Sequence, residues 1–148
     1  MGGKMLTLFL AALSGAAMAV QGTINSALGK VTGLWEATFI VHLTGLLLVA
    51  LLLFVFRTGQ GGLAQALNAP WYAYLGGMLG VIIVYLVIRS IPKVGVAPAT
   101  TAIILGQVFT AGIIDHLGLL GANKIPFTAV NAIGALLMAG GAFLILRQ

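Results

Sequence analysis

The sequence predicts an all-α integral membrane protein with five transmembrane helices, and three observations support this fold class. Hydrophobic residues make up 61% of the 148 positions and charged residues only 6%, whereas soluble domains carry about a quarter charged residues. Mean hydropathy is +1.17. Five apolar blocks approach the roughly 20 residues that cross a bilayer as a helix, and their continuous apolar runs lack the alternation of a β-barrel. We expect one transmembrane domain, residues 1–148, with spans at Met5–Ala27, Trp35–Phe56, Trp71–Ile88, Ala99–Ile114 and Phe127–Leu146.

The first span carries a stripe of polar residues. Ser14, Gln21 and Asn25 follow one another at intervals of seven and four residues, which keeps them on one narrow face of a helix that turns about 100° per residue. Carboxamides both donate and accept hydrogen bonds, so Gln21 and Asn25 are candidates for binding a polar or cationic solute. Polar side chains also join membrane helices to one another, and the sequence leaves both interpretations open.

The second span contains the deepest titratable residue of the chain. Thr38, His42 and Gly45 share one helix face by their four-then-three spacing. His42 could bind a proton or a solute near neutral pH, but we favour a neutral imidazole bonded to a carbonyl or hydroxyl group. Glu36 lies at the edge of the span, where it faces lipid headgroups or pairs with Lys30. If Glu36 turns inward, it is a candidate coupling or cation site.

The third span is marked by glycines and the fourth by a polar face. Gly76 and Gly80 are four residues apart, a spacing that permits close contact between membrane helices. Thr100, Gln107 and Asp115 of the fourth span lie on about one helix face. Gln107 is therefore a further candidate for solute binding.

The fourth span ends in an acidic residue beside a histidine. A carboxylate at a helix C-terminus is unfavourable, so we expect Asp115 to have a partner such as His116 or Lys124. The fifth span has Asn131 near its start, and we expect little chemistry there. Structural or gating roles are accordingly predicted for Ser14, Thr100, Asp115 and His116.

The positive charges are almost evenly divided between the two ends of the spans. Three lie on one side of the bilayer and four on the other, so the imbalance that sets orientation is nearly absent. We predict dual topology, with copies inserted both ways and paired antiparallel, although a small bias could still fix one orientation. Two inverted copies would supply the inverted repeat that encloses many transport sites, as a ten-helix dimer. The two sets are Lys4, Arg57 and Lys124 against Lys30, Arg89, Lys93 and Arg147.

Composition and motifs exclude other classes of function. Cysteine is absent, which rules out disulfides, thiolate catalysis and cysteine metal sites. Seven basic and two acidic residues do not make the basic surface of a nucleic-acid binder. The sequence contains no catalytic triad, metal-ligand spacing or phosphate-binding glycine loop. We therefore predict no enzyme, no cofactor, no metal and no nucleic-acid partner.

Several short motifs resemble those of one transporter family. In order they are Gln21-x-x-x-Asn25, Gly77-Met78-Leu79-Gly80, Pro92-x-x-Gly95-x-Ala97, Gly106-Gln107 and Asp115-His116-Leu117-Gly118. Their order along nearly the full chain is similar to that in the YdcZ-like half-size members of the drug/metabolite transporter superfamily. The resemblance implies a small hydrophobic protein of the bacterial inner membrane that occurs singly, in pairs or fused. It also favours Gln21, Asn25 and Gln107 as cavity residues.

These observations together predict a multi-pass transporter of small solutes that works by alternating access in the lipid bilayer. Its partner is a second, inverted copy of itself or a paired homologue. The expected midplane cavity is lined by Gln21, Asn25, His42 and Gln107. Two other classes stay open: a non-transporting scaffold or accessory subunit, and a channel-like facilitator.

Overall fold

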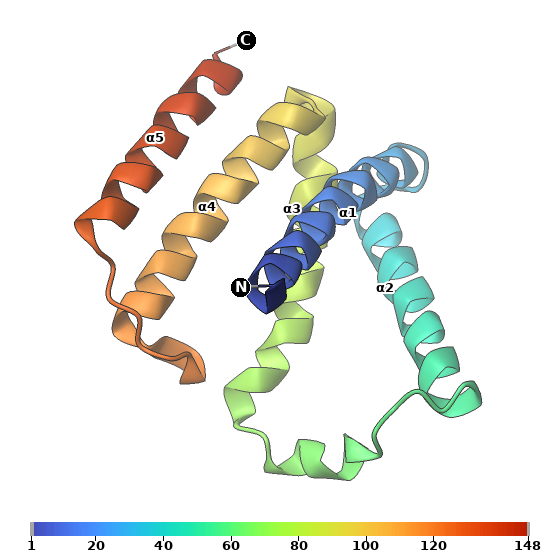
Figure 1. The fold of residues 1–148 in the computed structure, drawn as a ribbon. Coiled ribbons are helices and arrows are strands. Elements are labelled where there is room, and N and C mark those ends of the chain that lie inside the picture. The colour runs from blue at the N-terminus through green and yellow to red at the C-terminus, as the bar shows by residue number, and fades with distance from the viewer. Residues whose placement is uncertain (1, 148) are drawn as a thin grey trace. The chain divides into compact units, whose positions relative to one another are not determined.

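The computed structural model describes residues 2–147, which form helices and connections without any strand. Five helical segments are long and apolar enough to cross a membrane, which confirms the predicted number of spans (Figure 1). A π-helix, η1 (Leu51–Val55), extends the second helix, and three 3-10 helices lie in the connections: η2 (Gly62–Asn68), η3 (Trp71–Tyr74) and η4 (Leu119–Gly121). The α-helices are α1 (Gly2–Thr32), α2 (Leu34–Ala50), α3 (Leu75–Val94), α4 (Val96–Leu117) and α5 (Ala129–Leu146).

The helices are longer than the predicted spans at the first, third and fourth positions. α1 continues to Thr32, five residues beyond the predicted end at Ala27. α3 continues through Pro92 to Val94, six residues beyond the predicted end of the third span at Ile88. A proline removes one backbone hydrogen bond, and near the end of α3 that bond is one of the last in the helix. The second and fifth spans agree with the predicted bounds within two residues.

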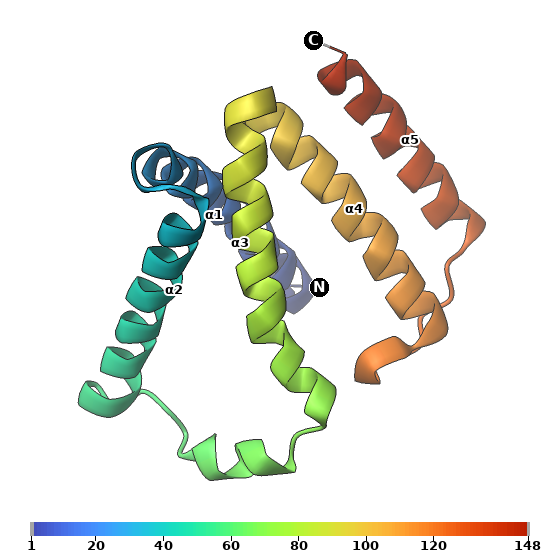
Figure 2. The ribbon, with the colours of Figure 1, turned by 180° about the vertical axis from the view of Figure 1, so that it is seen from behind.

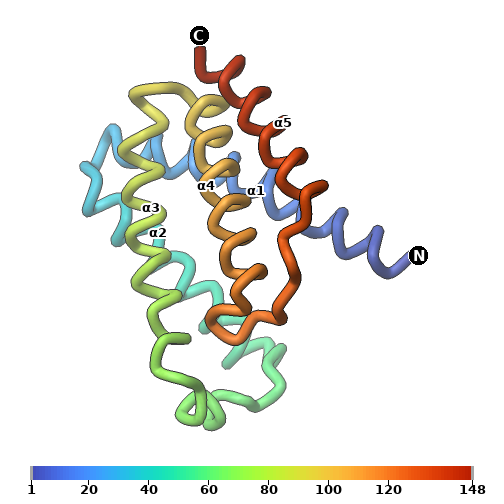
Figure 3. Tube along the Cα trace, turned by 90° about the vertical axis from the view of Figure 1, so that its left-hand side faces the viewer, coloured from blue at the N-terminus to red at the C-terminus, as the bar shows by residue number. Residues whose placement is uncertain are grey.

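The chain divides between Lys93 and Val94 into two compact units, each described by itself. In the first unit, α1 runs across α3 at a steep angle, and a long connection joins α2 to α3 (Figures 1 and 3). In the second unit, α4 and α5 lie side by side and antiparallel, which is also clear from behind (Figure 2). The first unit is therefore a crossed arrangement of helices and the second a helical hairpin.

Two glycines bring α1 against α3 in the first unit. A Cβ atom at Gly22 would lie 3.0 Å from Cγ1 of Val87 and 3.1 Å from Cδ1 of Ile91. A Cβ atom at Gly29 would collide with Cγ2 of Ile88, which is itself almost fully buried. The missing side chains thus allow close approach of the two helices, as small residues do in membrane proteins.

The first half of α1 makes no such contact. Residues 2–18 are exposed, and a Cβ atom at Gly15 would have nothing within 4 Å. Only the second half of α1 therefore belongs to the core of the first unit.

Single glycines precede both α2 and α4. Gly33 has φ 100° and ψ 164°, and Gly95 has φ 91° and ψ 166°, a region open essentially to glycine alone. The carbonyl of Gly33 accepts the N–H of Ala37 at 3.1 Å, and that of Gly95 accepts the N–H of Ala99 at 3.2 Å. The N–H of Gly33 also donates to the carbonyl of Gly29 at 3.1 Å. One residue therefore ends α1 and starts α2.

The connection from α4 to α5 is fixed at both helix ends. α4 ends at Gly118, whose left-handed conformation (φ 66°) is the usual glycine stop. α5 begins with a capping box in which the N–H of Thr128 donates to Oδ1 of Asn131 at 2.9 Å and the N–H of Asn131 donates to Oγ1 of Thr128 at 3.3 Å. Between them, the N–H of Ile125 donates to the carbonyl of Asp115 at 2.8 Å. These bonds position the side chains at this end of the hairpin.

Candidate functional site

The two carboxamides predicted on the first helix lie in different environments. Asn25 is buried, with 6% of its surface exposed, three residues after Gly22 on the part of α1 that packs against α3. Gln21 is exposed, and so is Ser14, which lies about two helical turns earlier on α1. The polar stripe therefore runs from the surface of α1 into the core of the first unit. Asn25 therefore belongs to the buried face of α1, whereas Gln21 belongs to its exposed face.

His42 links α2 to α3. Its Nδ1 lies 2.8 Å from the carbonyl oxygen of Thr38, and the Thr38 hydroxyl donates to the carbonyl of Leu34 at 2.7 Å. A carbonyl only accepts hydrogen bonds, so Nδ1 carries the proton and Nε2 is the acceptor of the neutral ring. Nε2 faces α3, because a Cβ atom at Gly80 would lie 3.6 Å from it. Gly80 thus makes room for an imidazole with a free acceptor.

Glu36 stays at the edge of its span. It belongs to the first turn of α2, where a negative charge is favourable next to the helix N-terminus. The carboxylate folds back over Gly33, since a Cβ atom there would lie 2.5 Å from Oε2 of Glu36. Glu36 is exposed. Its charge therefore lies beside the α1–α2 connection.

An aromatic pair forms a second contact between α2 and α3. The ring centroids of Trp35 and Tyr85 are 4.5 Å apart with an interplanar angle of 31°, within the range of favourable aromatic contacts. Trp35 is seven residues before His42, about two helical turns. α2 and α3 therefore contact each other at two places about two helical turns apart. One is the aromatic ring pair, and the other is the imidazole of His42 beside Gly80.

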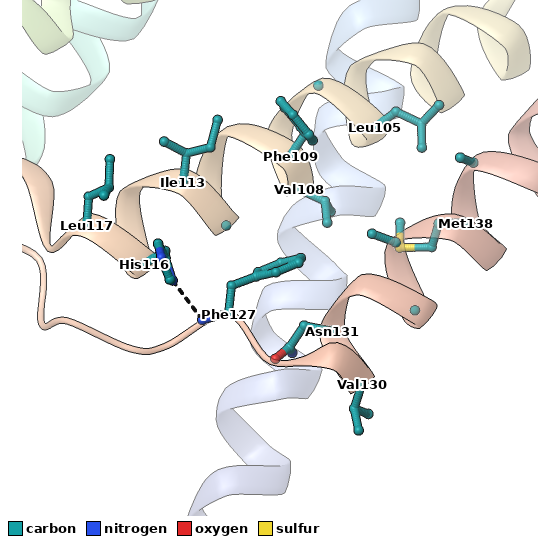
Figure 4. Close-up of a pocket in the computed structure, with 15 residues that line it drawn as sticks. Leu105, Val108, Phe109, Ile113, His116, Leu117, Phe127, Val130, Asn131 and Met138 are labelled. Atoms are coloured by element: carbon teal, nitrogen blue, oxygen red, sulfur yellow. Dashed lines mark hydrogen bonds between the residues drawn. The ribbon is translucent and has the colours of Figure 1, made fainter.

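The second unit contains a groove between α4 and α5 with a volume of about 1000 Å³ (Figure 4). Its walls are mainly apolar and include Phe109, Ile113 and Met138. The ring of Phe127 lies across Gly112, where a Cβ atom would be 3.0 Å from Cε2 of the ring. The ring of Phe127 therefore fits at this place because Gly112 has no side chain.

Two polar side chains line the groove at the end where α4 meets the connection to α5. Nδ1 of His116 accepts the backbone N–H of Phe127 at 3.1 Å (Figure 4). Oδ1 of Asn131 accepts the N–H of Thr128, which identifies that atom as oxygen. In each side chain the acceptor is engaged by the protein itself. The groups left for a ligand are Nε2–H of His116 and the amide N–H groups of Asn131.

The other predicted residues of α4 do not line this groove. Gln107 is exposed, and Thr100 and Asp115 are half-buried. We expected Asp115 to have a partner such as His116 or Lys124, but the hydrogen bond formed by His116 goes to the backbone of Phe127. Lys124 instead packs against the end of α4, with its Cβ 3.3 Å from a Cβ built at Gly118.

The predicted site residues are divided between the two units. The groove between α4 and α5 was not predicted from the sequence. Phe127 and Asn131 were missed, although Thr128-x-x-Asn131 has the spacing of a capping box, in which Glu or Gln is the usual fourth residue, and could have singled out Asn131. No comparable pattern marks Phe127. The first unit holds Ser14, Gln21, Asn25, Glu36 and His42, and the second holds Thr100, Gln107, Asp115 and His116.

Comparisons with known proteins agree with the fold. The family model described as "Putative inner membrane exporter, YdcZ" matches residues 6–144, a range that includes parts of all five spans. Neither the comparison with curated proteins nor that with solved structures gave a match. The family description names a membrane transporter, and the five apolar helices fit a multi-pass protein of the inner membrane. The resemblance seen in the motifs is confirmed, and the chain belongs to the YdcZ family of inner membrane exporters.

Proposed function

We propose that this protein exports small solutes by alternating access as an antiparallel homodimer of two inverted copies. The observation that supports this proposal is the exposure of Gln21 and Gln107, which lie well inside the spans of α1 and α4. A carboxamide facing hydrocarbon loses the hydrogen bonds that water would provide. Polar side chains inside membranes therefore face protein or a water-filled cavity. A second copy that encloses a cavity gives both carboxamides such surroundings.

The residues proposed for solute binding are polar side chains inside the spans. Gln21 and Gln107 hydrogen-bond the solute, since each can donate and accept. The free Nε2 of His42 adds an acceptor, and the buried Asn25 holds the neighbouring helices in place. Glu36 attracts a cation or proton at the mouth, while Ser14 and Thr100 are polar positions along the path.

The near balance of basic residues supports the antiparallel pairing. Three of the seven Lys and Arg residues lie on one side of the bilayer and four on the other, and only an imbalance would enforce one orientation. Two inverted copies then form by symmetry the inverted repeat on which many transporters are built.

The test is the orientation of the chain in the membrane, read from C-terminal reporters that are active on one side only. We expect the parent to show both orientations. Gln60→Lys with Asn68→Lys adds two charges to one side, and Val31→Lys with Val94→Lys adds two to the other. Each pair should produce a single orientation, opposite in the two cases. Gln60→Asn with Asn68→Gln is the neutral control and should leave the mixture unchanged.

Solute export should follow the orientation. Once a thermal-shift screen in detergent has identified a solute, cells that express only one of the two double-lysine variants should not export it. Co-expression of both variants should restore export. A parent that inserts in only one orientation would refute the antiparallel homodimer. A parent with both orientations whose export survives in a single lysine pair would refute the need for inverted copies.

A further inference from the structure

We propose that the groove between α4 and α5 binds an anionic phospholipid, with an acyl chain along the groove and the phosphate at His116 and Asn131. The proposal concerns the second unit alone and does not depend on the transport cycle. It rests on the shape of the groove, on the hydrogen-bonding groups at one end, and on the position of that end relative to the bilayer.

The groove matches the shape and polarity of an acyl chain. It has a volume of about 1000 Å³ and runs between two membrane-spanning helices. Phe109, Ile113 and Met138 supply apolar walls, and Gly112 leaves space that the ring of Phe127 partly fills. Such walls favour an apolar chain because they offer it contact area without exposing polar groups of the protein. The body of the ligand is therefore hydrocarbon.

The two polar side chains at this end of the groove offer hydrogen-bond donors and no free acceptor. Nδ1 of His116 already accepts the N–H of Phe127, so the remaining ring nitrogen of the neutral imidazole is a donor. Oδ1 of Asn131 already accepts the N–H of Thr128, so its amide N–H groups remain. A ligand head that only donates would find no partner in these two side chains. A phosphate, which accepts through several oxygens, can use the donors of both residues.

The charges near this end favour a negative head. Lys124 packs against Gly118 at the end of α4 and is the basic residue of the connection to α5. The N-terminus of α5 adds partial positive charge at the same end and the C-terminus of α4 adds partial negative charge, so the two helix ends largely offset one another and Lys124 carries the net positive charge. Asp115 is the opposing charge, but it is half-buried and does not line the groove. The groups that do line the groove at this end therefore select an anion.

The position of the donors distinguishes a membrane lipid from a soluble anion. His116 lies in the last turn of α4 and Asn131 in the first turn of α5, so both lie at the end of a span. The headgroups of a bilayer lie at the ends of its spanning helices. An anionic phospholipid places its phosphate at this level and its acyl chain beside the groove, whereas free phosphate has no part that fits the apolar walls.

The experiment uses phosphatidylglycerol with a photoreactive acyl chain, added to the full-length protein in phosphatidylcholine vesicles. After illumination, the adducts are located by mass spectrometry of peptides. We expect adducts in residues 105–117 and 127–139, which hold the groove lining. Unlabelled phosphatidylglycerol should compete, while phosphatidylcholine, oleate and inorganic phosphate should not.

Two variants remove donors without removing the contacts that shape the loop. Asn131→Asp keeps an acceptor for the N–H of Thr128 but replaces the amide donors with a negative charge. His116→Asp keeps an acceptor for the N–H of Phe127 but has no donor in place of Nε2–H. Each should reduce adduct formation by about tenfold, the effect expected from losing one hydrogen bond to a charged group. Asn123→Asp places the same charge in the same connection outside the groove and should change the yield little.

Other occupants of the groove would give different results. Labelling that both lipids compete for equally, or that the two donor variants leave unchanged, would show a non-selective groove and overturn the proposal. Competition by oleate as strong as that by phosphatidylglycerol would point to a fatty acid instead. Because the chain has no cysteine, Phe109→Cys reports a second copy: a disulfide between two chains, with no lipid adduct in the groove, would assign the groove to the dimer.

Discussion

His42 and His116 carry their protons on opposite ring nitrogens. Nδ1 of His42 lies 2.8 Å from the carbonyl oxygen of Thr38 and must donate, whereas Nδ1 of His116 lies 3.1 Å from the N–H of Phe127 and must accept. The free nitrogen is consequently an acceptor in His42 and a donor in His116. The chain has two histidines, so both states can be observed without interference from others.

Nitrogen-15 NMR of histidine-labelled protein tests this assignment directly. Under alkaline conditions that keep imidazoles neutral, one ring should be protonated at Nδ1 and the other at Nε2. His116→Asn leaves a single ring and assigns its signals to His42. Two rings of the same tautomer would contradict the hydrogen bonds at one of the two sites.

Gly33→Ala should destabilise the first unit. The backbone at Gly33 has φ 100° and ψ 164°, and holding a residue with a side chain there costs about 1–3 kcal/mol. The new Cβ atom would also lie 2.5 Å from Oε2 of Glu36. Gly15→Ala is the matched control, because its Cβ would meet nothing within 4 Å, and glycine inside a helix costs roughly 0.5–1 kcal/mol relative to alanine.

Thermal unfolding in mild detergent should therefore separate the two alanine variants. We expect the midpoint to fall for Gly33→Ala and to stay or rise for Gly15→Ala. Equal midpoints would mean that the connection between α1 and α2 accepts other conformations.

Asn25→Ala and Gln21→Ala should differ in their effects. Asn25 is buried in the first unit, and polar contacts between membrane helices contribute about 1–2 kcal/mol in model peptides, so its loss should lower the stability of the chain. Gln21 is exposed, so its loss should leave the fold intact and reduce solute binding. Stability is measured by thermal unfolding and binding by titration of the solute found in the screen. If Gln21→Ala lost the dimer but bound solute normally, a scaffold role would be favoured for this residue.

The pH dependence of export should depend on Glu36 rather than on His42. The carboxylate of Glu36 is exposed at the α1–α2 connection, where it can attract a proton or a cationic solute. His42 donates its Nδ1 proton to a backbone carbonyl and serves α2–α3 packing. We expect Glu36→Gln to abolish the pH dependence of flux, and His42→Gln to preserve folding and most of the flux.

Flux should be measured in the parent and both variants from about pH 3.5 to 8.5, a range that covers the ordinary titration of both carboxyl and imidazole groups. A parent whose pH dependence disappears only in His42→Gln would reverse the assignment. A parent with no pH dependence would exclude proton coupling through either residue.

The sequence predicted the number of spans because each span is an uninterrupted apolar run of bilayer length. The predicted first span ended too early because Lys30 and Thr32 are polar. In the structure α1 includes both residues, since the chain needs only Gly33 to turn into α2. The π-helix from Leu51 to Val55 could not be predicted, since its residues are apolar on every side and carry no periodic pattern.

The candidate site was predicted only in part. Polar residues inside spans are easily recognised from their cost in a membrane, so the sequence singled out Gln21, Asn25 and His42, whose roles stay predictions. The α4–α5 groove was not, because it is formed by apolar side chains and by the absence of one at Gly112. Its polar end depends on backbone N–H groups of Phe127 and Thr128, whose directions follow from the folded connection and not from residue type.

The unequal lengths of the connections in the first unit limit how its helices can move apart. Gly33 alone lies between α1 and α2, so their adjoining ends stay within two peptide units, roughly 7 Å. Residues 56–70, by contrast, contain only a short 3-10 helix and irregular backbone between η1 and η3, which provides slack between α2 and α3. If α2 moves away from α1, Gly33 is the pivot, the far end of α2 travels farthest and the 56–70 connection takes up the displacement.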